Sequence, residues 1–154
     1  MPKRSLLEVD VVNAVRAPVA PTRLRSVIRK AARLPEVEAR LPGGAATLAI
    51  RLTDDSELRR LNRDFSAHDA VTDVLSFEGE GMHLGDLAIS WPAVVRQAAA
   101  HGHIAETELA LLCVHGLLHL LGWDHATAAQ RREMTRITVA ALAESGVELA
   151  PGRL

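Results

Sequence analysis

Hydrophobic and polar residues alternate along several short stretches of this chain, which is the spacing of β-strands with one buried face. The alternation predicts strands over residues 6–15 and 47–53, and residues 74–77 and 84–90 are two further strand candidates. Two glycines within residues 78–82 predict a turn between the last two strands, which we expect to be neighbours in one sheet. The pattern therefore predicts a small β-sheet.

Helical spacing occupies most of the chain between and after these strands. Apolar residues recur every three or four positions over residues 21–34, and Pro35 follows the end. Helix starts and helical spacing predict further helices over residues 54–62, 92–100, 105 onward and 126–144. We expect residues 35–44 and 66–73 to form loops and residues 148–154 to be frayed. This mixture predicts an α+β fold in which residues 1–154 form one domain.

Composition agrees with one folded domain. The chain has 154 residues, of which 48% are hydrophobic and 24% are charged, so it can bury a core and is not disordered. Its single cysteine, Cys113, excludes an internal disulfide, suits a reducing cytoplasm and is expected in the core. We expect neither a membrane span nor export, because histidines interrupt the longest apolar stretch and no long apolar segment lies at the N-terminus.

The net charge of −1 provides no global basic field that would hold nucleic acid. RNA binding would therefore have to use local clusters of basic residues. One such cluster lies within residues 21–34 and consists of Arg23, Arg25, Arg29, Lys30 and Arg33. A charged helix face is more often simply solvated, so this cluster alone is weak evidence for RNA contact.

Three histidines near residue 120 have the spacing of a metal site. His115 and His119 are four residues apart and so lie on one face of a helix, where two imidazoles can reach one ion. Such a pair alone is more often two partly buried histidines bonded to carbonyls or water. Here Gly122 can end the helix and let His125 return as a third ligand. Three imidazoles leave a fourth position for water, which is the arrangement of a catalytic zinc, although nickel or cobalt would also suit these ligands.

The same spacing occurs in the extended zinc-protease pattern H-E-x-x-H-x-x-G-x-x-H, with one difference. The residue after the first histidine is Gly116, whereas the protease pattern has a glutamate that takes the proton from zinc-bound water. The difference opposes a metallopeptidase. Spacing alone leaves the substrate class open, since a three-histidine hydrolytic site is equally compatible with a phosphodiester, an amide or an ester.

Three segments resemble one known family, the bacterial YbeY-type zinc-dependent endoribonucleases. HGLLHLLGWDH, from His115 to His125, is similar to the family's H-G-x-L-H-L-x-G-[YW]-D-H motif. LNRDFSAHDAVTDVLSF (residues 61–77) and LGDLAIS (residues 84–90) resemble two further family segments in the same order. The resemblance implies a small mixed sheet flanked by helices, with a three-histidine zinc site at the end of a central helix.

The resemblance also implies an activity and partners. It implies that zinc-activated water attacks a phosphodiester of RNA, in ribosomal RNA maturation and ribosome quality control in the cytoplasm. The small ribosomal subunit and ribosomal or GTPase assembly proteins are the implied partners. The sequence itself assigns no catalytic base.

One departure from the family concerns phosphate binding. The family usually has an arginine where this chain has Ser66, and a serine carries no charge and cannot form a bidentate contact with phosphate. Nearby His68 is expected to be an exposed loop histidine. The departure keeps open an alternative, a ribosome assembly factor that holds RNA without cutting it and whose metal is structural or vestigial.

Other polar residues have less specific patterns. Asp124 can either orient a ligand imidazole or cap the following helix. Asp73 and Asp86 are typical of turns or caps, although either could line a cleft. Met134 is expected in the core. Three histidines without ligand spacing are expected at the surface, namely His83, His101 and His103.

Overall fold

The protein is described from a computed structural model, which covers residues 6–65, 68–71 and 73–154, with the side chains of 68–71 left undescribed. Five strands and six helices are present in these residues. The strands are β1 (Leu6–Asn13), β2 (Ala45–Thr53), β3 (His68–Val71), β4 (Val74–Glu78) and β5 (His83–Ser90). The helices are α1 (Pro21–Ala32), α2 (Pro35–Glu38), α3 (Asp55–Phe65), α4 (Trp91–His101), α5 (Ala105–Leu120) and α6 (Ala128–Ala143).

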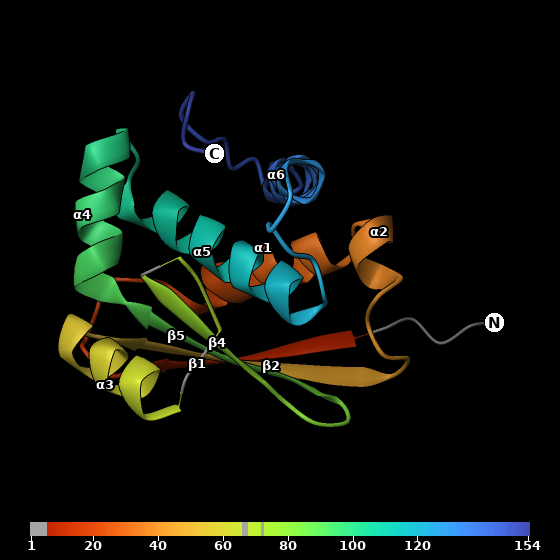
Figure 1. The fold of residues 1–154 in the computed structure, drawn as a ribbon, viewed down its shortest axis with the longest axis horizontal. Coiled ribbons are helices and arrows are strands. Elements are labelled where there is room, and N and C mark those ends of the chain that lie inside the picture. The colour runs from red at the N-terminus through yellow and green to blue at the C-terminus, as the bar shows by residue number, and fades with distance from the viewer. Residues whose placement is uncertain (1–5, 66–67, 72) are drawn as a thin grey trace.

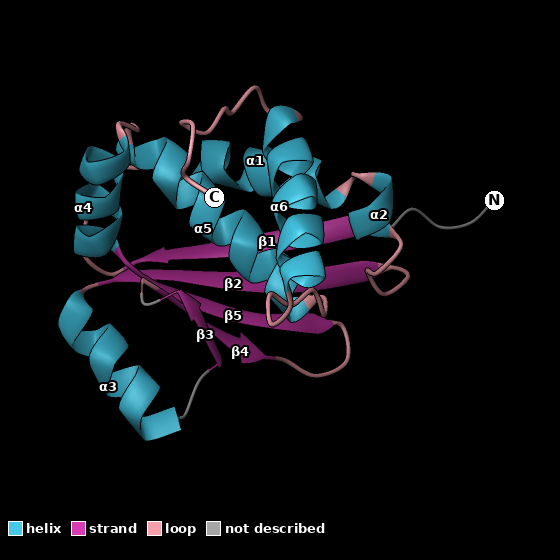
Figure 2. Cartoon of the chain, turned by 45° about the horizontal axis from the view of Figure 1, so that its top comes forward, coloured by secondary structure: helices cyan, strands magenta, loops and turns pink. Residues whose placement is uncertain are grey.

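The strands form one mixed sheet in the order β1-β2-β5-β4-β3 (Figure 2). β1, β2 and β5 are parallel to one another, while β4 is antiparallel to both β5 and β3. The predicted pairing of the two strands around the 78–82 turn is confirmed by β4 and β5. The fold is therefore the small α+β domain with a mixed sheet that the sequence predicts.

α5 is the central helix of the domain. Figure 1 shows α1 and α5 across one face of the sheet, with α6 stacked over them. One side of α5 packs on the sheet through Leu109, Cys113 and Leu117, which confirms the core position of the cysteine. Another side packs against α6 through residues that include Val114 and Leu118. Burial on two sides explains why this helix is apolar around most of its circumference.

α3 lies on the opposite face of the sheet (Figure 1). Its buried Leu58 packs against Leu75 of β4 and Ala88 of β5. The neighbouring Leu87 belongs to the core under α5, because successive side chains of a strand point to opposite faces. The two faces of the sheet are thus covered unequally, and α3 is the one helix of the described residues that packs on this face.

Two predicted loops contain regular structure. Residues 35–44 include the single-turn helix α2, which begins at Pro35 and buries Val37. Residues 66–73 include β3, so the loop prediction was wrong there; residues 66, 67 and 72 themselves lie outside the described structure. β3 is an edge strand that pairs with β4. A polar edge strand has little apolar alternation, so pairing with a neighbour decides its conformation.

Two basic residues of the 21–34 segment have a structural role at the other edge of the sheet. Arg25 Nε donates to the Val9 carbonyl at 3.0 Å, and Arg29 Nε donates to the Leu7 carbonyl at 3.3 Å. Both carbonyls belong to β1, an edge strand. These arginines cover an edge that would otherwise be free to pair with another chain, which accounts for part of the basic cluster without RNA.

The segment after α6 is held, and the prediction of a frayed tail was wrong. The backbone N–H of Ala150 donates to His103 Nε2 at 2.6 Å. Arg153 forms an ion pair with Glu108, whose side chain is fully buried. His103 is therefore buried and not the surface histidine that was expected, because it links α5 to this segment. Spacing could not predict this contact, since the partners lie 45 to 47 residues apart.

Local contacts fix the core and the helix starts. Met134 is buried in the core beside α5, as expected. Ser90 caps α4 by accepting a hydrogen bond from the Ala93 N–H. Asp54 accepts a hydrogen bond from the Glu57 N–H at the start of α3. Among the described helices, none is long and apolar enough to cross a membrane.

Candidate metal centre

A polar stripe runs along α5 between its two buried sides. At 3.6 residues per turn, Glu108, His115 and His119 fall within about 40° of one another around the helix axis. Two of the three predicted ligands therefore project from one face, one turn apart. Glu108 precedes them by two turns and is already engaged with Arg153.

The turn that follows α5 reverses the chain by a Schellman motif. Gly122 has a φ of 98°, in the left-handed region that glycine adopts without strain. Its N–H donates to the His119 carbonyl, and the Trp123 N–H donates to the Leu118 carbonyl, both at 3.1 Å. The buried Trp123 ring anchors the turn in the core. The prediction that Gly122 ends this helix is thus confirmed.

The reversal places His125 beside the two helical histidines. The ring centroid of His125 lies 6.1 Å from that of His115 and 6.0 Å from that of His119. The rings are nearly parallel, with interplanar angles of 19° and 17°. Residues from the last two turns of a helix and from the loop beyond it therefore meet at one place.

Two nitrogens of this cluster are unsatisfied. His115 Nε2 and His125 Nε2 are buried and have no hydrogen-bond partner among the residues that the structure describes. Buried polar atoms are nearly always hydrogen-bonded, so such atoms indicate a missing partner. Imidazole nitrogen is a preferred ligand of zinc and related divalent ions, and the donor set fits such an ion.

The three imidazole rings are not positioned as a complete set of metal ligands. Within the described residues, no group of three or more histidine, cysteine, aspartate or glutamate side chains is arranged tightly enough to hold a metal ion. The close approach of the three rings and their buried nitrogens nevertheless agree on one location. Rotation of half-buried rings is a small change compared with the folding that brings them together.

Burial holds His115 in the form that binds metals. Its pKa is lowered to about 4, first by burial and then by the nearby His125, His119 and Arg153. The imidazole is therefore neutral at all pH values well above 4. Neutral imidazole is the ligand form, so no proton has to be displaced from this residue at neutral pH.

Gly116 has a packing role on a different side of α5. A Cβ added at this residue would lie 2.7 Å from Leu87 Cδ2, which is too close. The absence of a side chain lets α5 approach β5. A glutamate here would meet the sheet, so the peptidase base has no room at this position.

The structure places the three aspartates, and it excludes one expected role of Asp124. Asp124 does not cap α6, because Thr127 caps it in a capping box with Gln130. Instead Asp124 Oδ1 accepts from the His125 backbone N–H at 2.7 Å. Asp86 shares the α3 face of β5 with Ala88 and lines a hollow there, whose lining does not include His115, His119 or His125.

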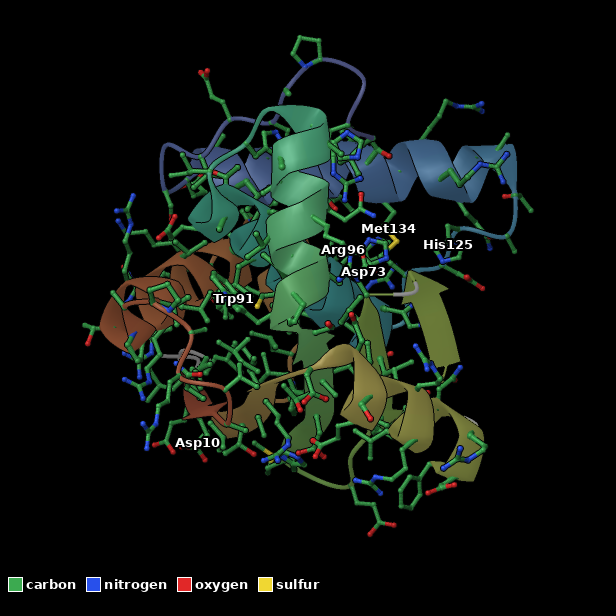
Figure 3. The ribbon with its side chains drawn as sticks, turned by 90° about the vertical axis from the view of Figure 1, so that its left-hand side faces the viewer. Asp10, Asp73, Trp91, Arg96, His125 and Met134 are labelled. Atoms are coloured by element: carbon green, nitrogen blue, oxygen red, sulfur yellow. The ribbon has the colours of Figure 1, made fainter. Side chains whose placement is uncertain are left out.

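Asp73 belongs to a groove on the α3 side that includes Leu58, Leu75 and Arg96. Figure 3 shows Asp73 and Arg96 beside α4, with His125 and Met134 on the side towards α6. Ser66 lies outside the described residues, as does the side chain of His68, so the structure does not place the predicted phosphate contact.

Of the histidines expected at the surface, His83 and His101 are partly exposed. His83 Nδ1 lies 2.7 Å from Thr47 Oγ1, and its Nε2 lies 3.3 Å from Asp86 Oδ2. These contacts lie near the starts of β2 and β5 and do not involve His115, His119 or His125.

Sequence reasoning missed Arg40. Its guanidinium carbon lies 3.7 Å from the centroid of the Trp123 ring, and Nη1 donates to the Leu121 carbonyl at 3.3 Å. The residue is 81 positions from Leu121 and belongs to a segment predicted as loop. The available signal was a single arginine in a polar stretch, which indicates no partner.

The fold and the cluster define a class, a small α+β protein with a three-histidine centre at the end of its central helix. The family model described as endoribonuclease YbeY matches residues 11–146. A relative in Roseiflexus castenholzii, named endoribonuclease YbeY, is 42% identical over 131 residues, covering 78% of this chain and 79% of the relative. The chain therefore belongs to the endoribonuclease YbeY family.

Two further comparisons agree. A relative of the same name in Gloeobacter violaceus is 52% identical over 102 residues, covering 59% of this chain and 53%, about half, of the relative. The solution structure of a Thermotoga maritima protein has a TM-score of 0.58 at 21% identity and covers 96% of this chain and 100% of that one. The likeness to this structure shows the fold.

Proposed function

We propose that this protein is a metal-dependent endoribonuclease whose divalent ion, most simply zinc, is held by His115, His119 and His125. The observation that carries the proposal is the meeting of three imidazole rings, with buried nitrogens on His115 and His125 that lack a hydrogen-bond partner in the described part of the chain, in a member of the endoribonuclease YbeY family. Three imidazoles leave room for solvent or substrate, as catalytic zinc sites do.

A bound divalent ion would act as a Lewis acid that offsets charge on a phosphodiester. It would also lower the pKa of water, so that hydroxide is available to attack the phosphodiester at neutral pH. The protein itself sets the protonation state and the position of the ligand histidines. Burial keeps His115 neutral. The turn at Gly122 and the hydrogen bond from the His125 backbone N–H to Asp124 fix the position of the His125 backbone, from which the third imidazole extends.

The substrate we propose is single-stranded RNA, in ribosomal RNA maturation and ribosome quality control. Membership of a family named for RNA cleavage supports it. The packing of Gly116 against Leu87 opposes peptide hydrolysis, because it leaves no place for the protease glutamate. The proposed partners are the small ribosomal subunit and ribosomal or GTPase assembly proteins, and the proposed compartment is the cytoplasm, where a chain with one cysteine needs no disulfide.

A second candidate is a ribosome assembly factor that binds RNA without cutting it. Ser66 favours it, because the position expected to carry an arginine has no charge for phosphate. Ser66→Arg separates the two candidates. A charge-assisted contact of ~1.5–3 kcal/mol should raise RNA affinity, and cleavage should rise with it if the protein is a nuclease.

The test is incubation of metal-replete protein with single-stranded RNA and ribosomal RNA precursors. We expect cleavage that disappears with chelator, returns with zinc and is absent in His115→Ala. Arg132→Ala, an exposed change on α6, is the matched control and should cut normally. Tight RNA binding with no cleavage under any metal would favour the assembly factor instead.

A further inference from the structure

One side chain from the N-terminal half of the chain holds the turn that carries the third histidine. The Arg40 guanidinium stacks on the Trp123 ring at 3.7 Å, and its Nη1 donates to the Leu121 carbonyl at 3.3 Å. Nη1 is also the nearest atom, at 3.5 Å, to the place where a Cβ of Gly122 would lie. Arg40 thus contacts Leu121 and Trp123 and lies beside Gly122, the residue between them.

The backbone of Arg40 is itself well anchored. It follows α2, and its N–H donates to the Val37 carbonyl at 3.0 Å. Val37 is completely buried in the same cluster as Trp123, and the next residue, Leu41, is also buried. The guanidinium therefore reaches the turn from a fixed backbone, although the residue as a whole is exposed.

The turn needs such support. The Leu121 carbonyl is among the last carbonyls of α5, which have no partner further along the helix. Gly122 has no side chain to restrict its backbone, so the residues after it would be free to sample other directions. A planar guanidinium can stack on an indole and donate a hydrogen bond in its own plane at the same time, which an ammonium cannot do.

We infer that Arg40 is a positioning residue of the metal centre: by holding Leu121 and Trp123, on either side of Gly122, it fixes the point from which His125 meets His115 and His119. The inference rests on the metal centre proposed above. It concerns the order of the turn before the ion binds, so it predicts a change in metal affinity rather than in the ligands themselves.

The test is zinc affinity, measured by competition with a chromophoric chelator at constant pH. Loss of the stacking and hydrogen-bond contacts in Arg40→Gln should weaken zinc binding about tenfold. Arg40→Lys should restore only a small part, because it returns the charge without the planar group. Arg132→Gln, an exposed change on α6, should bind zinc as the wild type does.

A second readout separates positioning from general stabilisation. The chain has two tryptophans, so Trp91→Phe leaves Trp123 as the one emitter. In that background Arg40→Gln should increase acrylamide quenching of Trp123, while the melting temperature of the metal-free protein changes little. Zinc should reduce the quenching in both forms, and should need a higher concentration in the Arg40 variant.

The outcomes of these experiments test the role of Arg40 separately from the metal centre. Equal zinc affinity in wild type, Arg40→Gln and Arg40→Lys would overturn the role of Arg40 while leaving the metal centre intact. A lower melting temperature with unchanged zinc affinity would likewise overturn it, since that is a structural role. Absence of zinc binding in the wild type would overturn the metal centre and this inference together. Weaker binding in Arg40→Gln with unchanged binding in Arg132→Gln supports it.

Discussion

The two ends of the polar stripe on α5 bury polar groups in opposite ways. At the first end the Glu108 carboxylate is fully buried and accepts from His103 and Arg153, with Arg153 contacting both of its oxygens. At the second end His115 Nε2 is buried without a hydrogen-bond partner in the described structure. A buried polar group with internal partners stabilises one conformation, whereas one without them indicates that a ligand completes the site.

The pKa shifts express the same difference. Burial pushes the pKa of Glu108 upward, but the hydrogen bonds from Arg153 and His103 outweigh it, and the pKa is lowered. For His115 burial also acts first, and the neighbouring charges act in the same direction, so the pKa falls to about 4. The surroundings of Glu108 therefore stabilise its charged form, whereas those of His115 stabilise its neutral form.

The largest effect is expected from breaking the satisfied end. Arg153→Met leaves the Glu108 carboxylate buried with its main partner gone, and should destabilise the protein by about 3–5 kcal/mol. Urea unfolding measures the loss. The double variant Glu108→Leu/Arg153→Met should recover much of it, because no buried charge remains. A loss below about 1 kcal/mol in Arg153→Met would show that this cluster does not hold the segment after α6.

A smaller effect concerns pH. The His115 pKa is about 4 in the folded state against 6.5 in the unfolded state, so between these values only the unfolded chain takes up the proton. The stability of the metal-free protein should therefore rise as pH increases from about 4 to 6.5, by up to about 3 kcal/mol. His115→Asn should flatten this slope above pH 4.5, where Glu108 does not interfere. An unchanged slope would mean that the imidazole is not shielded from water.

The smallest effect concerns the side of α5 that faces the sheet. Gly116→Ala places a Cβ against buried Leu87, and overpacking should cost about 1–3 kcal/mol, offset by roughly 1 kcal/mol of helix propensity. Thermal unfolding measures the net change, and zinc affinity should remain as in the wild type. A large drop in zinc affinity would show that the position belongs to the metal centre and not only to the helix packing.

Sequence patterns predicted the features that depend on residues close to one another in the chain. The spacing of His115 and His119 and the glycine at 122 are short-range features, and the structure brings these histidines to His125 as the spacing requires. β3 was missed because an edge strand need not alternate. The Glu108 cluster and the Arg40 contact were missed because a charged residue carries no information about a partner many positions away.

The contrast between the Glu108 end and the histidine end of α5 is tested most directly by the zinc content and zinc titration of protein purified without chelator. We expect about one ion per chain in the wild type and in the Arg132→Ala control, with sharply reduced occupancy in His119→Ala, because two imidazoles are too few ligands for a tight site. A metal content near zero with no stabilisation by added zinc, or equal occupancy in His119→Ala, would contradict it.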